Sequence, residues 1–233
     1  MSKTLYTLVV DNYAPEIVEL TFPWLQLHAQ KMGARFEVID ERRYPDWPVT
    51  YEKFQIYDRA EKNGDDWSVF LDADTLVHPE TPDWTAYLPP DTVAHHGRDF
   101  AGVRWRTNKY FQRDGRNIGS CNWNTTASSL CRDLWHPLGM VHPSIVVANI
   151  FPTVGENNTG LIQPAHLIDD YVCSLNIARY GLKFTTIREL QKSLGFDPTK
   201  TGFYFHEYTI PVSEKVERLA ETIDRWGLKS YKR

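Results

Sequence analysis

The order of strand-like and helix-like stretches constrains the fold of this chain more than any other feature. A β-rich run at residues 4–10 precedes a helical pattern from about Pro15 to Met32, in which a kink is expected at Pro23. A strand-like stretch follows at 36–40. This β-α-β start predicts right-handed crossovers and an α/β fold, with a mostly parallel central sheet flanked by helices in a single domain over the 233 residues.

The third expected strand ends abruptly at two acidic residues. A helical pattern at 51–64 leads into an apolar run at 67–71, which Asp72 and Asp74 follow. Side chains alternate along a strand, so these two carboxylates would point the same way if the strand continued. Parallel sheets bind ligands beyond the carboxyl ends of their strands, so we expect this pair and Asp11, after the first strand, to face one crevice.

Two carboxylates at such a position suit a hard divalent cation, which binds through carboxylates and substrate phosphates. The stretch FLDADTL resembles the DxD metal motif of the GT-A glycosyltransferases, which hold the diphosphate of a nucleotide sugar. The resemblance covers most of residues 4–210 and implies a Rossmann-like GT-A fold. It implies that Asp72 and Asp74 bind Mn²⁺ or Mg²⁺, with His206 in FYFHEY as the third ligand. The alternatives are an acidic surface turn for the pair and a packed or surface side chain for the histidine.

A second acidic pair begins a helical pattern that is expected to run to Tyr180. Asp169 and Asp170 resemble the acidic pair near the acceptor site of many GT-A enzymes. A carboxylate there can accept the proton of an incoming hydroxyl as general base, with Asp170 the first choice and Asp169 the second. Aspartate is also a favoured helix cap, and one residue can cap while its neighbour faces the crevice.

Donor contacts are expected near the first strand and the second helix. By the same resemblance, Asp11 contacts the base or ribose and Lys53 approaches the diphosphate. Lys53 is expected in the first turn of a helix, where a cation opposes the macrodipole, although a solvated lysine is the simpler interpretation. Asn158 and Gly160 belong to a polar loop suited to hydrogen bonds with sugar hydroxyls, or to an ordinary turn.

The stretch at 95–126 has no regular pattern and is expected to be an insertion that binds the acceptor. Within it, residues 98–116 carry six basic and two acidic side chains with interleaved aromatic residues. Cations contact phosphates and aromatic rings stack on bases or sugars, so the expected acceptor is an anionic glycan, or DNA with a hydroxylated base of the sort some phage glucosyltransferases modify. A solvated loop that pairs with the acidic strand ends is the alternative.

The whole sequence carries a net charge of −4, so it has no overall attraction to nucleic acid or anionic membranes. No run of about 20 apolar residues could span a bilayer, and the amino terminus meets Asp11 too early for a secretory signal. The 3 cysteines lack CxxC spacing and indicate neither a disulfide framework nor a zinc site. A cytoplasmic protein is expected, with a C-terminal helix within 211–233.

These features together predict metal-dependent transfer of a sugar from a nucleotide sugar, a UDP-sugar by preference, to a hydroxyl acceptor. FLDADTL also resembles the DxDxT strand end of haloacid-dehalogenase-like phosphatases, with Asp169 and Asp170 as that family's later acidic pair. In that family the motif ends the first strand, whereas two expected strands precede it here. A non-catalytic module that binds a sugar or nucleotide in the same cleft is the third possibility.

Overall fold

The computed structural model describes residues 1–95, 132–137, 173, 176–177, 180–204 and 210–228. At its centre, β1 (Lys3–Leu8) lies between β2 (Arg35–Ile39) and β3 (Trp67–Phe70), and both pairings are parallel. In this register Leu5 lies opposite Phe36 on one side and Val69 on the other. The expected α/β fold with parallel strands is therefore confirmed, and the carboxyl ends of all three strands meet at one edge.

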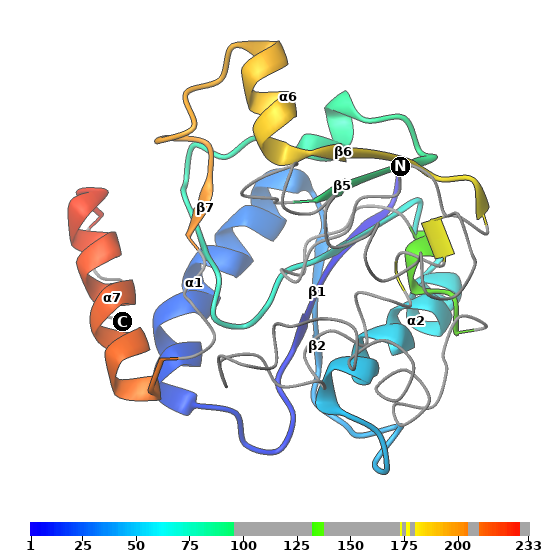
Figure 1. Cartoon of the computed structure of the whole chain (residues 1–233), viewed down its shortest axis with the longest axis horizontal. Helices are drawn as coiled ribbons and strands as arrows, with labels where there is room; N and C mark the ends of the chain where they lie inside the picture. Colours follow the sequence, from blue (N-terminus) through cyan, green and yellow to red (C-terminus); the bar gives the residue numbers. More distant parts are fainter. Residues whose placement is uncertain (96–131, 138–172, 174–175, 178–179, 205–209, 229–233) are drawn as a thin grey trace, which may run out of the picture.

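Helices α1 (Pro15–Met32) and α2 (Gln55–Asn63) lie on opposite sides of the β1–β2 pair (Figure 1). Helix α1 continues through Pro23 as one helix, and its buried side chains include Ile17 and Leu25. Gly64 ends α2 in the left-handed conformation at φ 64°, which a residue without a Cβ adopts freely. The helix end expected at Gly64 is thus confirmed.

The start of the second helix differs from the prediction. Residues Val49–Phe54 form a 3₁₀ helix, η1, which begins after Pro48 and runs directly into α2. Lys53 therefore lies in the last turn of η1, where a positive charge is favourable, and not in the first turn of a helix. The prediction that Lys53 opposes a helix macrodipole was therefore wrong. The sequence pattern is helical throughout this stretch and does not distinguish 3₁₀ from α geometry.

Two further strand pairs adjoin the central sheet. β4 (Leu76–Val77) pairs antiparallel with β7 (Phe203–Tyr204), and β5 (Thr92–His95) pairs parallel with β6 (Lys183–Thr186). Helix α6 (Ile187–Leu194), which was not predicted from the sequence, follows β6 without a connecting loop. Two 3₁₀ helices, η2 (Trp84–Tyr87) and η3 (Arg132–Trp135), and the last helix, α7 (Val212–Arg225), complete the described elements.

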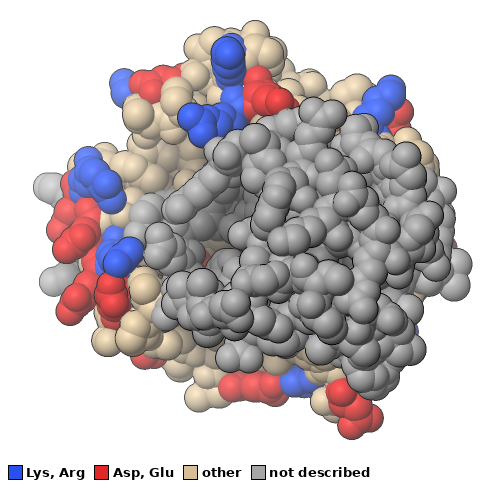
Figure 2. All heavy atoms as spheres, viewed as in Figure 1, with Lys and Arg blue, Asp and Glu red and all other residues tan. Residues whose placement is uncertain are grey.

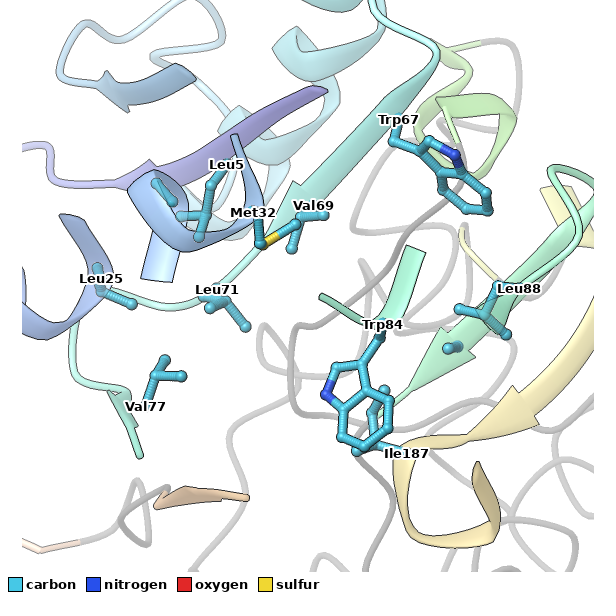
Figure 3. Close-up of a cluster of buried hydrophobic side chains, with 12 residues drawn as sticks. Leu5, Leu25, Met32, Trp67, Val69, Leu71, Val77, Trp84, Leu88 and Ile187 are labelled. Carbon is cyan, nitrogen blue, oxygen red and sulfur yellow. The ribbon is translucent and has the colours of Figure 1, made fainter. Parts of the chain in front are cut away.

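The main hydrophobic core lies between the central sheet, α1 and the β5–β6 pair. Figure 3 shows Leu5, Met32 and Val69 gathered where α1 meets the sheet, with Trp84 and Ile187 together beside β5. A second cluster joins α1 to α7 and β4 and consists of Ile17, Trp24, Leu76, Leu219 and Ile223. This second cluster fixes α7 beside the chain segment that leaves β3. Across the described residues, no helix combines the length and apolar character needed to cross a bilayer.

Candidate active site

The two acidic residues after β3 lie in a tight turn. β3 ends at Phe70, and the Thr75 N–H donates to the carbonyl of Asp72 at 3.0 Å. The strand does not continue through Asp72 and Asp74, so the condition for aligning them by strand alternation is not met. Instead of neighbouring positions on one strand, a single turn carries both carboxylates at the carboxyl edge of the sheet.

Tyr13, which follows β1, connects the first strand to this acidic turn. Its hydroxyl donates to Asp74 Oδ2 at 2.7 Å. Burial raises the pKa of Tyr13 well above its ordinary value, and the negative charges of Asp74 and Asp72 raise it further. Both carboxylates therefore act on the same hydroxyl group, which keeps its proton and orients Asp74.

Each carboxylate of the turn is paired with a lysine. Lys53 Nζ lies 3.6 Å from Asp72 Oδ1, and Lys215 Nζ of α7 lies 3.5 Å from Asp74 Oδ2. The lysine side chains are only 6% and 10% exposed, and lysine is rarely buried to this degree unless it is paired. The Lys53 ammonium also lies 5.1 Å from the centre of the Phe70 ring, within range of a cation–π contact.

Lys215 and Tyr13 were not predicted from the sequence. A signal for Lys215 was present, because it lies four residues before Leu219 on the buried stripe of α7, where an apolar side chain is expected. Tyr13 had no comparable signal, since only the fold brings it to Asp74.

The loop between β1 and α1 has a strained backbone. Asp11, Asn12 and Ala14 have φ angles of 55°, 56° and 26°, a region that residues with a side chain seldom occupy. The Tyr13 N–H donates to the Val10 carbonyl at 3.2 Å and closes a turn around the first two. Such strain is concentrated at functional sites. In this loop Asp11 contacts Arg42, and Tyr13 contacts Asp74.

Asp11 is held by an arginine that follows β2. Arg42 Nη1 lies 2.7 Å from Asp11 Oδ2, and Arg42 Nε donates to Glu52 Oε1 at 2.9 Å. The fully buried Glu52 carboxylate also accepts the backbone N–H groups of Arg43 and Tyr44, each at 2.9 Å. These contacts hold the loop after β2 against η1, and they place the exposed Asp11 at the same edge of the sheet as the acidic turn.

The ligand chemistry of Asp72 and Asp74 fits a hard divalent cation. Magnesium usually takes one or two protein carboxylates and completes its shell with water and substrate phosphates, so two aspartates are sufficient. Among the described residues, no three His, Cys, Asp or Glu side chains gather into a larger ligand set. The ammonium group of Lys53 contacts Asp72, and that of Lys215 contacts Asp74. A cation bound to the two aspartates would share each carboxylate with its lysine.

The other predicted site residues lie outside the described residues. They are the third metal ligand, the general-base pair and the polar loop, namely His206, Asp169, Asp170, Asn158 and Gly160, together with the basic segment 98–116. Figure 2 shows Lys and Arg interspersed with Asp and Glu around the described part of one face, α7 included. The predicted contact of the 98–116 segment with an anionic acceptor stays a prediction.

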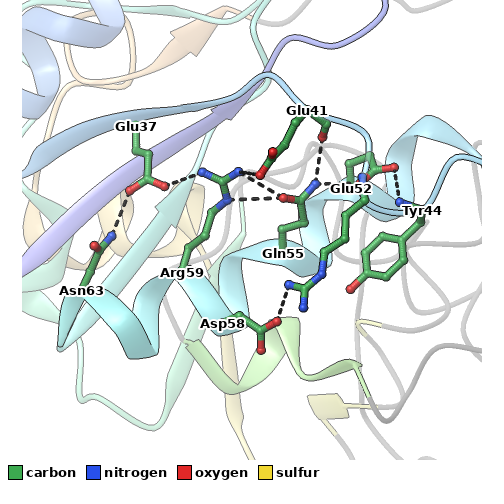
Figure 4. Close-up of polar contacts among 9 residues, drawn as sticks. Glu37, Glu41, Tyr44, Glu52, Gln55, Asp58, Arg59 and Asn63 are labelled. Carbon is green, nitrogen blue, oxygen red and sulfur yellow. Dashed lines mark hydrogen bonds and ion pairs between the residues drawn. The ribbon is translucent and has the colours of Figure 1, made fainter.

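An open hollow of about 660 Å³ lies along α2 and β2, and neither aspartate of the acidic turn lines it. Figure 4 shows Arg59 between Glu37 and Glu41, at 2.8 and 3.0 Å from their carboxylates. Arg43 pairs with Asp58 on the same surface. These charged side chains of the hollow are therefore engaged in ion pairs, which connect α2 to β2 and the loop after it. The acidic turn is the better candidate site.

One solved structure with a similar fold is a glycosyltransferase involved in the glycosylation of the major capsid of PBCV-1. The likeness has a TM-score of 0.50 at 13% sequence identity, and it covers 94% of this chain and 100% of that chain. No family model matches the sequence, and no curated protein matches it either. At this identity the likeness concerns the fold, which is that of a glycosyltransferase.

Proposed function

We propose that the protein transfers a sugar from a nucleotide sugar to a hydroxyl acceptor with the help of Mn²⁺ or Mg²⁺. The acidic turn at the carboxyl end of β3 carries this proposal, because it places two carboxylates where parallel sheets bind ligands. The fold shared with a glycosyltransferase supports the same conclusion.

The chemistry explains the types of residue at the turn. Sugar transfer leaves a nucleoside diphosphate while positive charge develops on the sugar ring, so the leaving group must be neutralised. When bound, a divalent cation supplies this charge as a Lewis acid. Asp72 and Asp74 would hold the cation, Tyr13 orients Asp74, and the Lys53 ammonium adds a positive charge beside Asp72.

The remaining roles, on both the donor and the acceptor side, are proposed for residues that were predicted from the sequence alone. Asp170, or Asp169 beside it, would take the proton of the incoming hydroxyl. His206 would complete the metal ligands, and Asn158 and Gly160 would hydrogen-bond the donor sugar. Asp11 would contact the base or ribose of a UDP-sugar, and the basic segment 98–116 would bind an anionic glycan or modified DNA.

Ligand-dependent thermal unfolding tests this proposal. UDP, GDP and their sugars are added with and without Mn²⁺, and we expect a rise in Tm with a UDP ligand only when the metal is present. The rise should disappear in Asp72→Asn, and release of UDP from the donor should fall by about 100-fold or more. Asp224→Asn, which removes the same charge from an exposed position on α7, is the matched control.

Two results would contradict the proposal. Calorimetric binding of the donor that is unchanged in Asp72→Asn would reject the metal role of the turn. Stabilisation by UDP-sugar in the wild type without any release of UDP, with or without the acceptor candidates, would indicate a binding module in place of an enzyme.

A further inference from the structure

Helix α7 carries a buried cation to the acidic turn. The Lys215 side chain is 10% exposed, and its Nζ lies 3.5 Å from Asp74 Oδ2. The same oxygen accepts a hydrogen bond from the Tyr13 hydroxyl at 2.7 Å. The Lys215 ammonium and the Tyr13 hydroxyl therefore reach this carboxylate oxygen from opposite ends of the described chain. Asp72 has Lys53 as its own counter-ion at 3.6 Å.

Packing alone does not account for a lysine at this position. α7 is held to α1 by the apolar contacts of Leu219 and Ile223 with Ile17 and Trp24. Burial of an ion pair requires desolvation of both charges, and an apolar side chain of similar length often serves at least as well in a packed interface. The charge of Lys215 is therefore best explained by the group that it faces.

We propose that Lys215 sets the divalent-cation affinity of Asp72 and Asp74 by acting as a built-in counter-ion of Asp74. This inference rests on the metal role that the proposed function gives to the two aspartates. A cation bound to Asp74 shares its carboxylate with the ammonium group, and the two positive charges repel each other at short range. Loss of the lysine charge should therefore strengthen cation binding, although it removes a favourable ion pair.

Binding of Mn²⁺ to the full chain, followed by electron paramagnetic resonance of the free ion, tests the inference without any nucleotide or sugar. We expect Lys215→Met to bind Mn²⁺ with a Kd about tenfold lower than the wild type. Lys215→Arg, which keeps the charge, should retain a Kd close to that of the wild type. Asp74→Asn should weaken binding in both backgrounds and thereby locate the ion.

Lys183→Met is the matched control, because it breaks a Lys–Asp pair of the same kind with Asp91 at 3.0 Å, in an exposed position on β6. It should leave the Kd for Mn²⁺ unchanged. Circular dichroism establishes that each variant is folded, and Lys215→Gln replaces Lys215→Met if that variant does not fold.

An unchanged or higher Kd in the folded neutral variants would overturn the inference, as would a wild type and Lys215→Met that both fail to bind Mn²⁺. The two proposals can fail separately. If Lys215→Met tightens Mn²⁺ binding and the wild type releases no UDP, the counter-ion role stands and the transferase proposal fails. If UDP release is metal-dependent and the Kd does not respond to Lys215, the reverse holds.

Discussion

His28 is a titratable side chain in the buried face of α1. Its ring lies edge-on to that of Phe203, with 6.1 Å between ring centres, and burial lowers its pKa to about 4 from the ordinary 6.5. Between these two pH values the unfolded chain binds a proton at this site and the folded chain does not. The contribution of His28 to stability is therefore fully present above pH 6.5 and is lost as the pH falls towards 4.

We expect the free energy of unfolding to fall as the pH drops and His28 is driven to bind a proton. His28 alone should lower it by about 3 kcal/mol between neutral pH and pH 4, from about 1.4 kcal/mol for each unit of pKa difference. His28→Gln removes the titrating group and should flatten the dependence on pH. Urea unfolding of both proteins at several pH values measures the difference, and parallel curves would contradict the assignment.

At the residue scale, the sequence predicted the groups that follow a strand and missed those that only the fold brings near. Asp72 and Asp74 were recognisable because an apolar strand ends directly before them. Tyr13 and Lys215 were not predicted, since each meets Asp74 from a distant part of the sequence. Spacing along the chain carries no information about such pairs.

At the scale of elements, a capping box defines α6. The Glu189 N–H donates to Thr186 Oγ1 at 3.1 Å, and the Thr186 N–H donates to Glu189 Oε2 at 3.3 Å. Thr186 is both the last residue of β6 and the N-cap of the helix. The cap therefore sets the position at which the chain changes direction.

Thr186→Ala should lower the free energy of unfolding by about 1 kcal/mol, because the first turn of α6 loses its side-chain acceptor. Ser193→Ala, at an exposed position of the same helix, should change stability by less than about 0.5 kcal/mol. Chemical unfolding of the two variants gives the comparison. Equal effects would mean that the capping box does not stabilise α6.

The absence of a connecting loop explains why α6 was missed. The residues KFTTI at 183–187 have the composition of a strand, which hides the start of α6 at Ile187. The Thr-x-x-Glu spacing and Gly195, which ends α6 at φ 73°, were the available signals. Helices α1 and α7 were predicted because a long periodic pattern does not depend on where a single turn begins.

At the scale of the whole molecule, the amino edge of the central sheet has a polar network of its own. The fully buried Asp65 carboxylate lies 2.6 Å from Arg35 Nη2 and accepts the hydroxyls of Thr4 and Tyr6 at 2.9 and 2.7 Å. These residues belong to β1, β2 and the entry to β3. One carboxylate therefore joins all three strands at the edge opposite the acidic turn.

Asp65→Ala should lower the free energy of unfolding by about 3 kcal/mol, because it leaves the partners of a buried charge unsatisfied. The Kd for Mn²⁺ of the folded variant should equal that of the wild type, since the acidic turn lies at the other edge. Asp66→Ala, whose side chain is 55% exposed, should change stability by less than about 1 kcal/mol. A changed Mn²⁺ affinity in Asp65→Ala would show that the two edges are coupled.

The alternation of strands and helices was sufficient to predict the parallel sheet, because each crossover leaves a periodic pattern in the sequence. The antiparallel pairing of β4 with β7 was not predicted, since the two residues of β4 leave no such pattern. The pairing is determined by tertiary contacts, including the bond from the His78 N–H to the carbonyl of Gly202 at 3.1 Å.

The packing of α7 on α1 has a consequence for synthesis on the ribosome. The apolar side chains of Ile17 and Trp24 leave the ribosome early, yet Leu219 and Ile223, which cover them, are translated last among the described elements. A growing chain therefore exposes this part of α1 until α7 has been translated. The same delay keeps Asp74 without its α7 lysine until the helix docks, so the acidic turn acquires its final charge balance only after α7 has been translated.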